Sequence, residues 1–148
     1  MQRITLSDMD RLVSEVLVHC VSQHKTAATI LTLQGNLGAG KTTFVQALAR
    51  TLGVSSAVQS PTYVLMKSYP ITFHQFRTLV HIDAYRLDTP EEFSALNPQS
   101  FLSDPSVLVC IEWPERLVGM LPRPDVEIQL AHIQGEETVR MIEIQKAS

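Results

Sequence analysis

Residues 35–43, GNLGAGKTT, form a short stretch in which small residues precede one lysine and two threonines. Gly35, Gly38 and Gly40 allow a backbone turn tight enough for successive N–H groups to face one anion. Lys41 and Thr42 complete the pattern G-x-x-x-x-G-K-[ST], in which the lysine reaches the β- and γ-phosphates of a nucleotide and the hydroxyl ligates magnesium. The stretch therefore predicts a site for a nucleoside triphosphate and Mg²⁺.

The residues on both sides of this loop favour the same interpretation. Residues 28–34 alternate in a β-rich run typical of a strand, and residues 42–53 carry apolar side chains at helical spacing up to Gly53. A helix that starts at the loop directs the positive end of its dipole at the phosphates. The alternative is an exposed glycine-rich turn with a solvated lysine. We expect an exposed loop, in which Lys41 buries no core surface. The residues expected to contact the nucleotide are Asn36, Leu37, Gly38, Ala39, Gly40, Lys41, Thr42 and Thr43.

Two carboxylates at predicted strand ends are candidates to complete the site. Asp83 follows the run LVHI and Glu112 follows the run VLVCI, and ligands of open α/β sheets bind at the carboxyl ends of strands. Either carboxylate could hold magnesium through water or orient a nucleophile. The alternative is that each caps a helix or pairs with Arg86 or Arg116. We favour the functional role, because a P-loop site requires an acid at the end of a hydrophobic strand.

Other polar residues give weaker indications. Ser60-Pro61-Thr62 lies between the predicted helix and the next strand, a region that often senses the γ-phosphate through a hydroxyl and a backbone amide. The five histidines have no ligand spacing and are expected on the surface or in the core. Cys20 and Cys110 lie in apolar runs and are expected to be reduced core residues.

The remaining pattern predicts a three-layer α/β/α sandwich with a mixed sheet, resembling a P-loop NTPase. A first helix follows Ser7 as its N-cap, a short helical piece begins at Pro90, and another helix begins at Pro114. A buried central strand is expected at 106–112, because it is apolar on both faces. Two antiparallel hairpins are also expected: 63–70 with 78–85 around the loop 71–77, and 125–133 with 138–144 around Gln134-Gly135.

Length and composition limit the classes of function. The 148 residues, 45% of them hydrophobic, predict one domain spanning residues 1–148 with a full core. The formal net charge is −3 and lysine is scarce, so no broad basic face for nucleic acid is indicated, although contacts through arginine stay open. The first ten residues lack an apolar core, and the longest apolar runs are strand-sized. We therefore expect a cytoplasmic protein without a membrane span or signal peptide.

Four segments in this order and spacing resemble the bacterial TsaE family, the small ATPase of tRNA threonylcarbamoyladenosine synthesis: GNLGAGKTTF, SPTYVL, HIDAYRL followed by PEEF, and IEWPERL. The resemblance extends from about residue 4 to about residue 144. It implies that Lys41 and Thr42 bind phosphate and Mg²⁺, and that Asp83 and Glu112 serve the metal and hydrolysis, with Thr42 and Glu112 as the expected metal ligands. Thr62 would be the nucleotide-sensing switch.

The sequence departs from the family pattern at two positions. Asn36 replaces the usual aspartate before the Leu-Gly-Ala-Gly run, and Ala84 replaces a usual leucine between the aspartate and the tyrosine. Neither change removes a phosphate or magnesium ligand. The first removes a negative charge beside the site, so nucleotide affinity or turnover is expected to differ from that of relatives.

The resemblance also implies ATP as the nucleotide and the transferase subunits TsaD and TsaB as partners, with tRNA bound only through the complex. ATP binding would drive assembly of that complex, and hydrolysis would permit repeated turnover. No arginine finger or water-positioning glutamine is obvious near the loop, so hydrolysis by the isolated protein is expected to be slow. The alternatives are a small-molecule P-loop kinase and a nucleotide-controlled binding module without meaningful turnover. An Asn-Lys-x-Asp guanine-reading motif is absent, which agrees with ATP rather than GTP.

Overall fold

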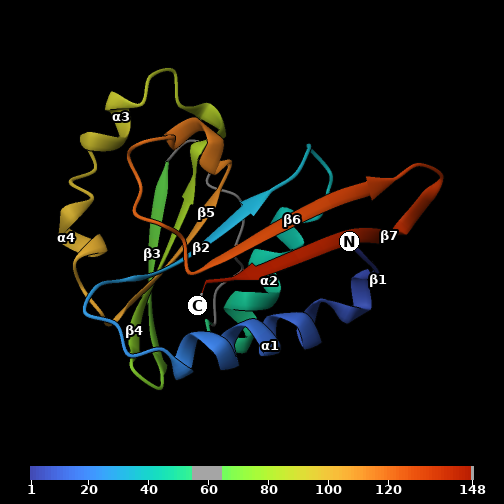
Figure 1. Cartoon of the computed structure of the whole chain (residues 1–148), viewed down its shortest axis with the longest axis horizontal. Coiled ribbons are helices and arrows are strands. Elements are labelled where there is room, and N and C mark those ends of the chain that lie inside the picture. The colour runs from blue at the N-terminus through green and yellow to red at the C-terminus, as the bar shows by residue number, and fades with distance from the viewer. Residues whose placement is uncertain (55–64, 148) are drawn as a thin grey trace.

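The structure is a computed structural model that describes residues 1–54 and 65–147. In this part of the chain seven strands form one mixed sheet in the order β1-β7-β6-β2-β5-β4-β3 (Figure 1). The strands are β1 (Gln2–Thr5), β2 (Thr29–Gln34), β3 (Met66–Phe73), β4 (Phe76–Asp83), β5 (Val107–Glu112), β6 (Val126–Ile133) and β7 (Glu136–Lys146). The α-helices are α1 (Met9–Ser22), α2 (Lys41–Thr51), α3 (Glu91–Ser94) and α4 (Gln99–Leu102), and the 3₁₀ turns are η1 (Leu6–Asp8), η2 (Ala84–Arg86) and η3 (Pro114–Leu117).

The four inner strands are parallel, and their carboxyl ends meet at one edge of the sheet. Strand β2 pairs in parallel with β5 on one side and β6 on the other, and β5 pairs in parallel with β4. The outer strands β3, β7 and β1 are antiparallel to their neighbours. The loop after β2 and the last residues of β4 and β5 therefore lie at the same edge, where ligands of such sheets bind.

Helices cover both faces of the sheet, as the sequence predicted. Helices α1 and α2 pack on one face, and α3, α4 and the turn η3 pack on the other (Figure 1). Strand β5 is buried along its whole length, which confirms the prediction of a strand with apolar contacts on both sides. Cys20 and Cys110 are buried and free, as expected. None of the helices in the described residues is long and apolar enough to span a membrane.

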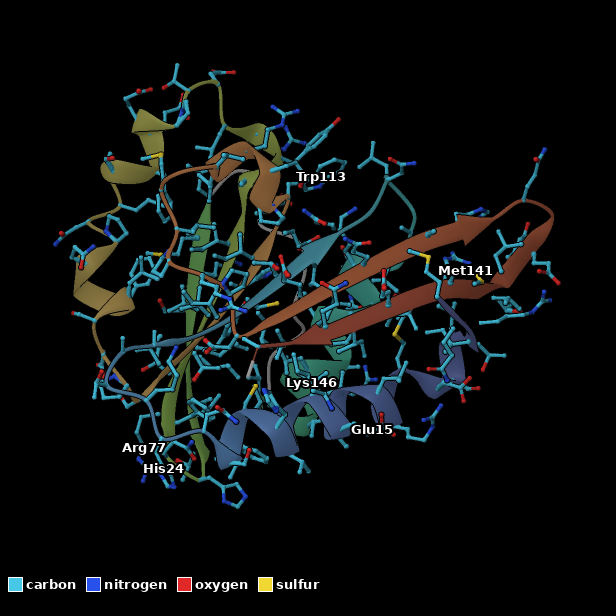
Figure 2. The ribbon with its side chains drawn as sticks, viewed as in Figure 1. Glu15, His24, Arg77, Trp113, Met141 and Lys146 are labelled. Atoms are coloured by element: carbon cyan, nitrogen blue, oxygen red, sulfur yellow. The ribbon has the colours of Figure 1, made fainter. Side chains whose placement is uncertain are left out.

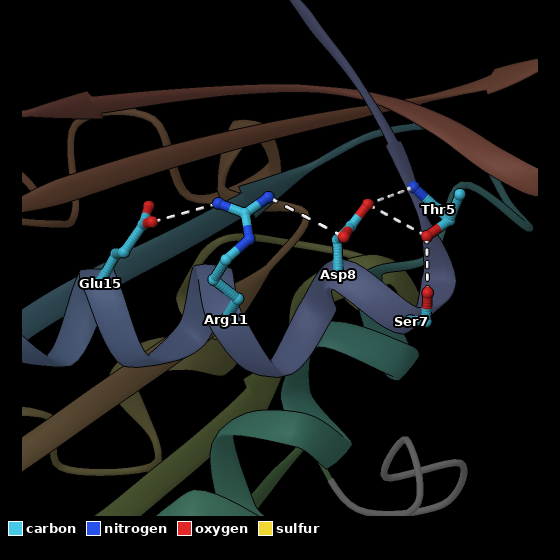
Figure 3. Close-up of polar contacts among 5 residues, drawn as sticks. All are labelled: Thr5, Ser7, Asp8, Arg11 and Glu15. Carbon is cyan, nitrogen blue, oxygen red and sulfur yellow. Dashed lines mark hydrogen bonds and ion pairs between the residues drawn. The ribbon is translucent and has the colours of Figure 1, made fainter.

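The start of the first helix differs from the prediction. Ser7 does not cap it, because the chain first makes the 3₁₀ turn η1 and α1 begins at Met9. The Asp8 carboxylate accepts hydrogen bonds from the Thr5 backbone N–H (2.9 Å) and the Thr5 hydroxyl (3.0 Å), while the Ser7 hydroxyl lies 2.7 Å from that of Thr5 (Figure 3). Thr5 and Asp8 thus form a capping box at the start of η1, which takes the place of the predicted cap by Ser7.

The first hairpin is longer than predicted. Strands β3 and β4 continue through most of the expected loop, and only His74 and Gln75 lie between them. Phe76 is fully buried, so hydrophobic burial extends the strand to the turn. Pro70 is tolerated because β3 is an edge strand. The expected beginning of this strand, at residues 63 and 64, lies outside the described residues.

Two further elements also differ. Strand β1, which pairs with β7 at the sheet edge, was not predicted, because four residues carry too short a pattern. Pro114 does occupy the first turn of a helical segment, but the segment is the short 3₁₀ turn η3. The closing hairpin around Gln134-Gly135 is confirmed, with β6 and β7 antiparallel.

Candidate nucleotide-binding site

The loop between β2 and α2 has the backbone that its glycines predicted. Gly35 has φ +155°, and a Cβ at this position would lie 2.5 Å from the carbonyl oxygen of Leu130 on β6. Gly40, the N-cap of α2, has φ +107°, a backbone conformation that residues other than glycine rarely adopt. Helix α2 begins at the next residue, so its N-terminal N–H groups and its dipole face the space beside the loop.

Lys41 is buried, which corrects the expectation that it lies in an exposed loop. Its side chain is 5% exposed, and its Nζ donates to the carbonyl oxygens of Gly35 and, at 2.9 Å, of Asn36. The ammonium also lies 4.3 Å from the centre of the Trp113 ring. Burial lowers the pKa of Lys41, although the nearby carboxylates of Glu112, Asp83 and Glu115 oppose this shift. The loop thus holds a largely desolvated cation against its own carbonyl groups.

Asp83 and Glu112 lie directly opposite each other, at the last positions of the neighbouring parallel strands β4 and β5. Asp83 is partly exposed, and its Oδ1 accepts a hydrogen bond of 3.0 Å from the Tyr85 N–H. Burial raises the pKa of Asp83, with a further contribution from the charge of Glu112, and the Tyr85 hydrogen bond opposes the shift. Glu112 is only 2% exposed. The two acids are therefore close. The alternative role is observed in part, because Asp83 is the N-cap of the turn η2. No ion pair with Arg86 or Arg116 occurs for either acid among the described residues.

His81 is a residue of this site that sequence reasoning missed. It lies on β4 two residues before Asp83, is fully buried, and shares a hydrogen bond of 2.6 Å between its Nε2 and Oε2 of Glu112. Its strand partner is Cys110, two residues before Glu112. The sequence offered one clue, because a histidine inside a hydrophobic strand needs a polar partner and an acid ends the neighbouring strand. The histidine holds the Glu112 carboxylate from the side of the core.

Trp113 lines the cavity and is also packed in part against the core. It follows β5 at the carboxyl edge of the sheet (Figure 2) and is partly buried against the cluster under η3. Its backbone has φ 61°, which is strained for a bulky side chain, and its N–H donates to the Leu33 carbonyl oxygen at 3.2 Å. Its ring lies 4.9 Å from that of Tyr85. The strained turn thereby places an aromatic wall beside Lys41.

These groups surround a cavity of about 320 Å³, a volume in the range of ligand pockets. Among the predicted nucleotide contacts, Asn36 and Ala39 do not line the cavity: Ala39 is buried in the core, and Asn36 accepts the Lys41 hydrogen bond through its carbonyl. Thr62 and the segment around it lie outside the described residues. Arg86, which the sequence offered only as an ion-pair partner, and Arg140, which sequence reasoning missed, also line the cavity. The cavity is lined by Leu37, Gly38, Gly40, Lys41, Thr42, Thr43, Asp83, Tyr85, Arg86, Glu112, Trp113 and Arg140.

The donor set of this cavity fits a magnesium nucleotide. The carboxylates of Asp83 and Glu112 and the hydroxyl of Thr42 are hard oxygen donors, which Mg²⁺ prefers together with phosphate oxygens. Lys41 and the N-terminus of α2 supply the positive charge that phosphates require. The raised pKa of Asp83 also agrees with a site for a cation, because its desolvated carboxylate lacks a counter-charge at hydrogen-bond distance in the described residues.

The fold and the loop together define a P-loop NTPase-like protein. The family described as Threonylcarbamoyl adenosine biosynthesis protein TsaE matches residues 7–142, and the chain belongs to this family. A solved structure of similar fold is Bacillus subtilis YdiB, with a TM-score of 0.71 and 23% identity, over 99% of this chain and 84% of the other.

Several curated relatives carry the name tRNA threonylcarbamoyladenosine biosynthesis protein TsaE. The relative from Nostoc is 33% identical over 147 residues, which cover 97% of this chain and 85% of the relative. The relative from Haemophilus influenzae is 32% identical over 119 residues, covering 80% and 73% of the two chains. The relative from Treponema pallidum is 41% identical over 102 residues, covering 69% and 72%. The resemblance noted in the sequence is therefore confirmed along most of the chain.

Proposed function

We propose that the protein is a Mg²⁺-dependent ATPase of tRNA threonylcarbamoyladenosine biosynthesis, which binds ATP at the loop after β2 and hydrolyses it to drive assembly and turnover of a TsaB–TsaD transferase complex. The pathway is proposed from the names of its relatives. The observation that best supports the chemistry is the pairing of Asp83 with Glu112 across β4 and β5, in the same cavity as Lys41 and Thr42.

Each residue has a distinct role in this proposal. The backbone N–H groups of residues 38–43 and the N-terminus of α2 bind the phosphates, and Lys41 exchanges its carbonyl partners for the β- and γ-phosphate oxygens. Thr42 and Glu112 hold the magnesium, which when bound neutralises phosphate charge. Asp83, the more exposed of the two acids, orients the attacking water. His81 holds the Glu112 carboxylate in a fixed orientation.

The proposal requires partners for full activity. Arg86 lines the cavity together with Tyr85, and the Arg116 guanidinium lies 5.6 Å from the Tyr85 ring. Arg140, which also lines the cavity, lies beside Gly40, and in this proposal none of the three arginines acts as an arginine finger. We therefore expect slow phosphate release by the isolated protein and acceleration by TsaB and TsaD, with tRNA reached through that complex.

The test is phosphate release and threonylcarbamoyladenosine formation in a reaction reconstituted with TsaB, TsaD and tRNA. Glu112→Ala and Asp83→Ala should each bind ATP within about tenfold of the wild type, because the phosphates are held mainly by the loop and Lys41. Each should lose on the order of a hundredfold in hydrolysis rate, because the metal and the water are no longer held in line. Glu15→Ala, an exposed carboxylate on α1 (Figure 2), serves as the matched control.

Three outcomes would contradict this proposal in different ways. If either variant hydrolyses ATP at the wild-type rate, that carboxylate is only a strand-end residue. Transfer of phosphate to an added nucleoside, in place of release, would identify a small-molecule kinase. Nucleotide-dependent assembly with TsaB and TsaD but without phosphate release would identify a binding module that does not need turnover.

A further inference from the structure

A buried arginine from the far end of the chain lines the cavity without a complete set of partners. Arg140 on β7 is only 9% exposed. Its Nη1 donates to the backbone carbonyl oxygens of Glu137 (2.7 Å) and Val139 (2.9 Å), whereas its Nε is buried and has no hydrogen-bond partner in the described part of the chain. A buried charged donor without an acceptor is costly, so such a group indicates a place for a ligand.

The register of the sheet explains why Arg140 reaches the loop. Strand β2 ends with Gln34 paired to Gln129 of β6, whereas Arg140 pairs with His132, three residues further along β6. The β6–β7 hairpin therefore projects past the end of β2 by about 10 Å. Arg140 immediately precedes Met141, which Figure 2 labels on β7. A Cβ placed on Gly40 would lie 3.9 Å from the Arg140 Nε, so the guanidinium lies beside the N-terminus of α2.

Arg140 lies on the opposite side of β2 from the two acids. In the sheet order, β6 and β7 follow β2 on one side, and β5 and β4, which carry Glu112 and Asp83, follow it on the other. Magnesium ligands and the lysine mark the β- and γ-phosphate end of a nucleotide held by such a loop. With the β- and γ-phosphates at the acids, the flank that carries Arg140 is open to the α-phosphate end of a nucleotide.

We propose that Arg140 binds the α-phosphate of the nucleotide, a contact that ATP and ADP share. The inference rests on the proposed nucleotide site and adds a binding residue to it. A guanidinium suits this position, because its planar fork can keep Nη1 on the two carbonyl groups and still offer the Nε–H to an anionic oxygen. The competing interpretation is that Arg140 only ties together the backbone at the start of β7.

The test compares Arg140→Gln, Arg140→Lys and the wild type by calorimetric titration with ADP and with a non-hydrolysable ATP analogue, both with Mg²⁺. Arg11→Gln is the matched control, because it removes an arginine that is 53% exposed on α1 and pairs with Glu15. Thermal unfolding without nucleotide checks that each variant is folded. We expect Arg140→Gln to weaken both nucleotides by the same factor, about tenfold or more, with Arg140→Lys between it and the wild type.

Each other outcome would overturn the assignment for a stated reason. Unchanged affinity of folded Arg140→Gln for both nucleotides means that Arg140 is a structural tie. Loss confined to the ATP analogue places the guanidinium at the γ-phosphate. If Arg140→Gln does not fold, Arg140→Lys decides, and wild-type affinity for both nucleotides in that variant counts against a directed α-phosphate contact. A wild type that binds neither nucleotide would reject the proposed function itself, a result distinct from the failure of Arg140 alone.

Discussion

The contact between His81 and Glu112 should be measurable as an energetic coupling. Both side chains are buried, at 0% and 2% exposure, and their hydrogen bond is 2.6 Å long. Removing one partner of a buried polar pair leaves the other desolvated, so His81→Ala should lower the free energy of unfolding by about 3 kcal/mol or more. A hydrogen bond that involves a charged group contributes about 1.5–3 kcal/mol. We therefore expect an interaction energy of about 1.5–3 kcal/mol between His81 and Glu112.

The assay is urea denaturation of the wild type, His81→Ala, Glu112→Ala and the double variant, which together form a double-mutant cycle. Val80→Ala combined with Glu112→Ala is the control pair, because the Val80 side chain lies on the opposite face of β4 from that of His81. The control pair should be additive within about 0.5 kcal/mol. A coupling between His81 and Glu112 that is no larger than the control value would refute the assignment of His81 as the residue that orients Glu112.

Three further predictions follow from the geometry of the site and the core. The pKa of Asp83 is raised in the folded protein, so ionisation of its carboxyl group destabilises the fold above that pKa. This destabilisation disappears below the ordinary aspartate pKa of about 3.9. Asp83→Asn should therefore raise the unfolding temperature at pH 7, and the difference from the wild type should disappear near pH 3. Gly35→Ala should lower the free energy of unfolding by about 2 kcal/mol or more, because the new Cβ would lie 2.5 Å from the Leu130 carbonyl oxygen. Gly38→Ala should lower it by only about 1 kcal/mol, because no heavy atom lies within 4 Å of a Cβ at that position. Equal losses of the two variants in urea denaturation would contradict this prediction. Burial raises the pKa of Cys20 to about 12 and that of Cys110 well above its usual value. A thiol reagent at pH 8 should therefore modify the two cysteines only when urea unfolds the protein. Rapid labelling of the native protein would contradict this prediction.

The parts of the fold that the sequence predicted are those with strong local patterns. The strand 28–34, the glycines of the loop and the helix after it are set by alternation, by positive φ angles and by helical spacing, and all three occur as expected. Residues 106–112 were predictable for the same reason, since a run that is apolar on both faces fits only a covered strand. The positions of Asp83 and Glu112 followed from the ends of these runs.

The contacts that sequence reasoning missed depend on tertiary pairing. The link between His81 and Glu112 requires β4 and β5 to be neighbours in one particular register, and periodicity within a single strand carries no such information. Arg140 is 100 residues beyond Gly40 in the chain and reaches the loop only because the β6–β7 hairpin extends past β2. The burial of Lys41 has the same origin, because Trp113, which follows β5 and is far from Lys41 in the sequence, lies against its ammonium.

The measurement that tests the central claim most directly is calorimetric titration of the wild type and Lys41→Ala with a non-hydrolysable ATP analogue in the presence of Mg²⁺. Lys41 is a desolvated cation whose lowered pKa reflects a cost of burial, so its removal should leave the fold intact, which thermal unfolding checks. The account predicts stoichiometric binding by the wild type and loss of tight binding by folded Lys41→Ala. Equal affinities of the two proteins would contradict a phosphate site at residues 35–43.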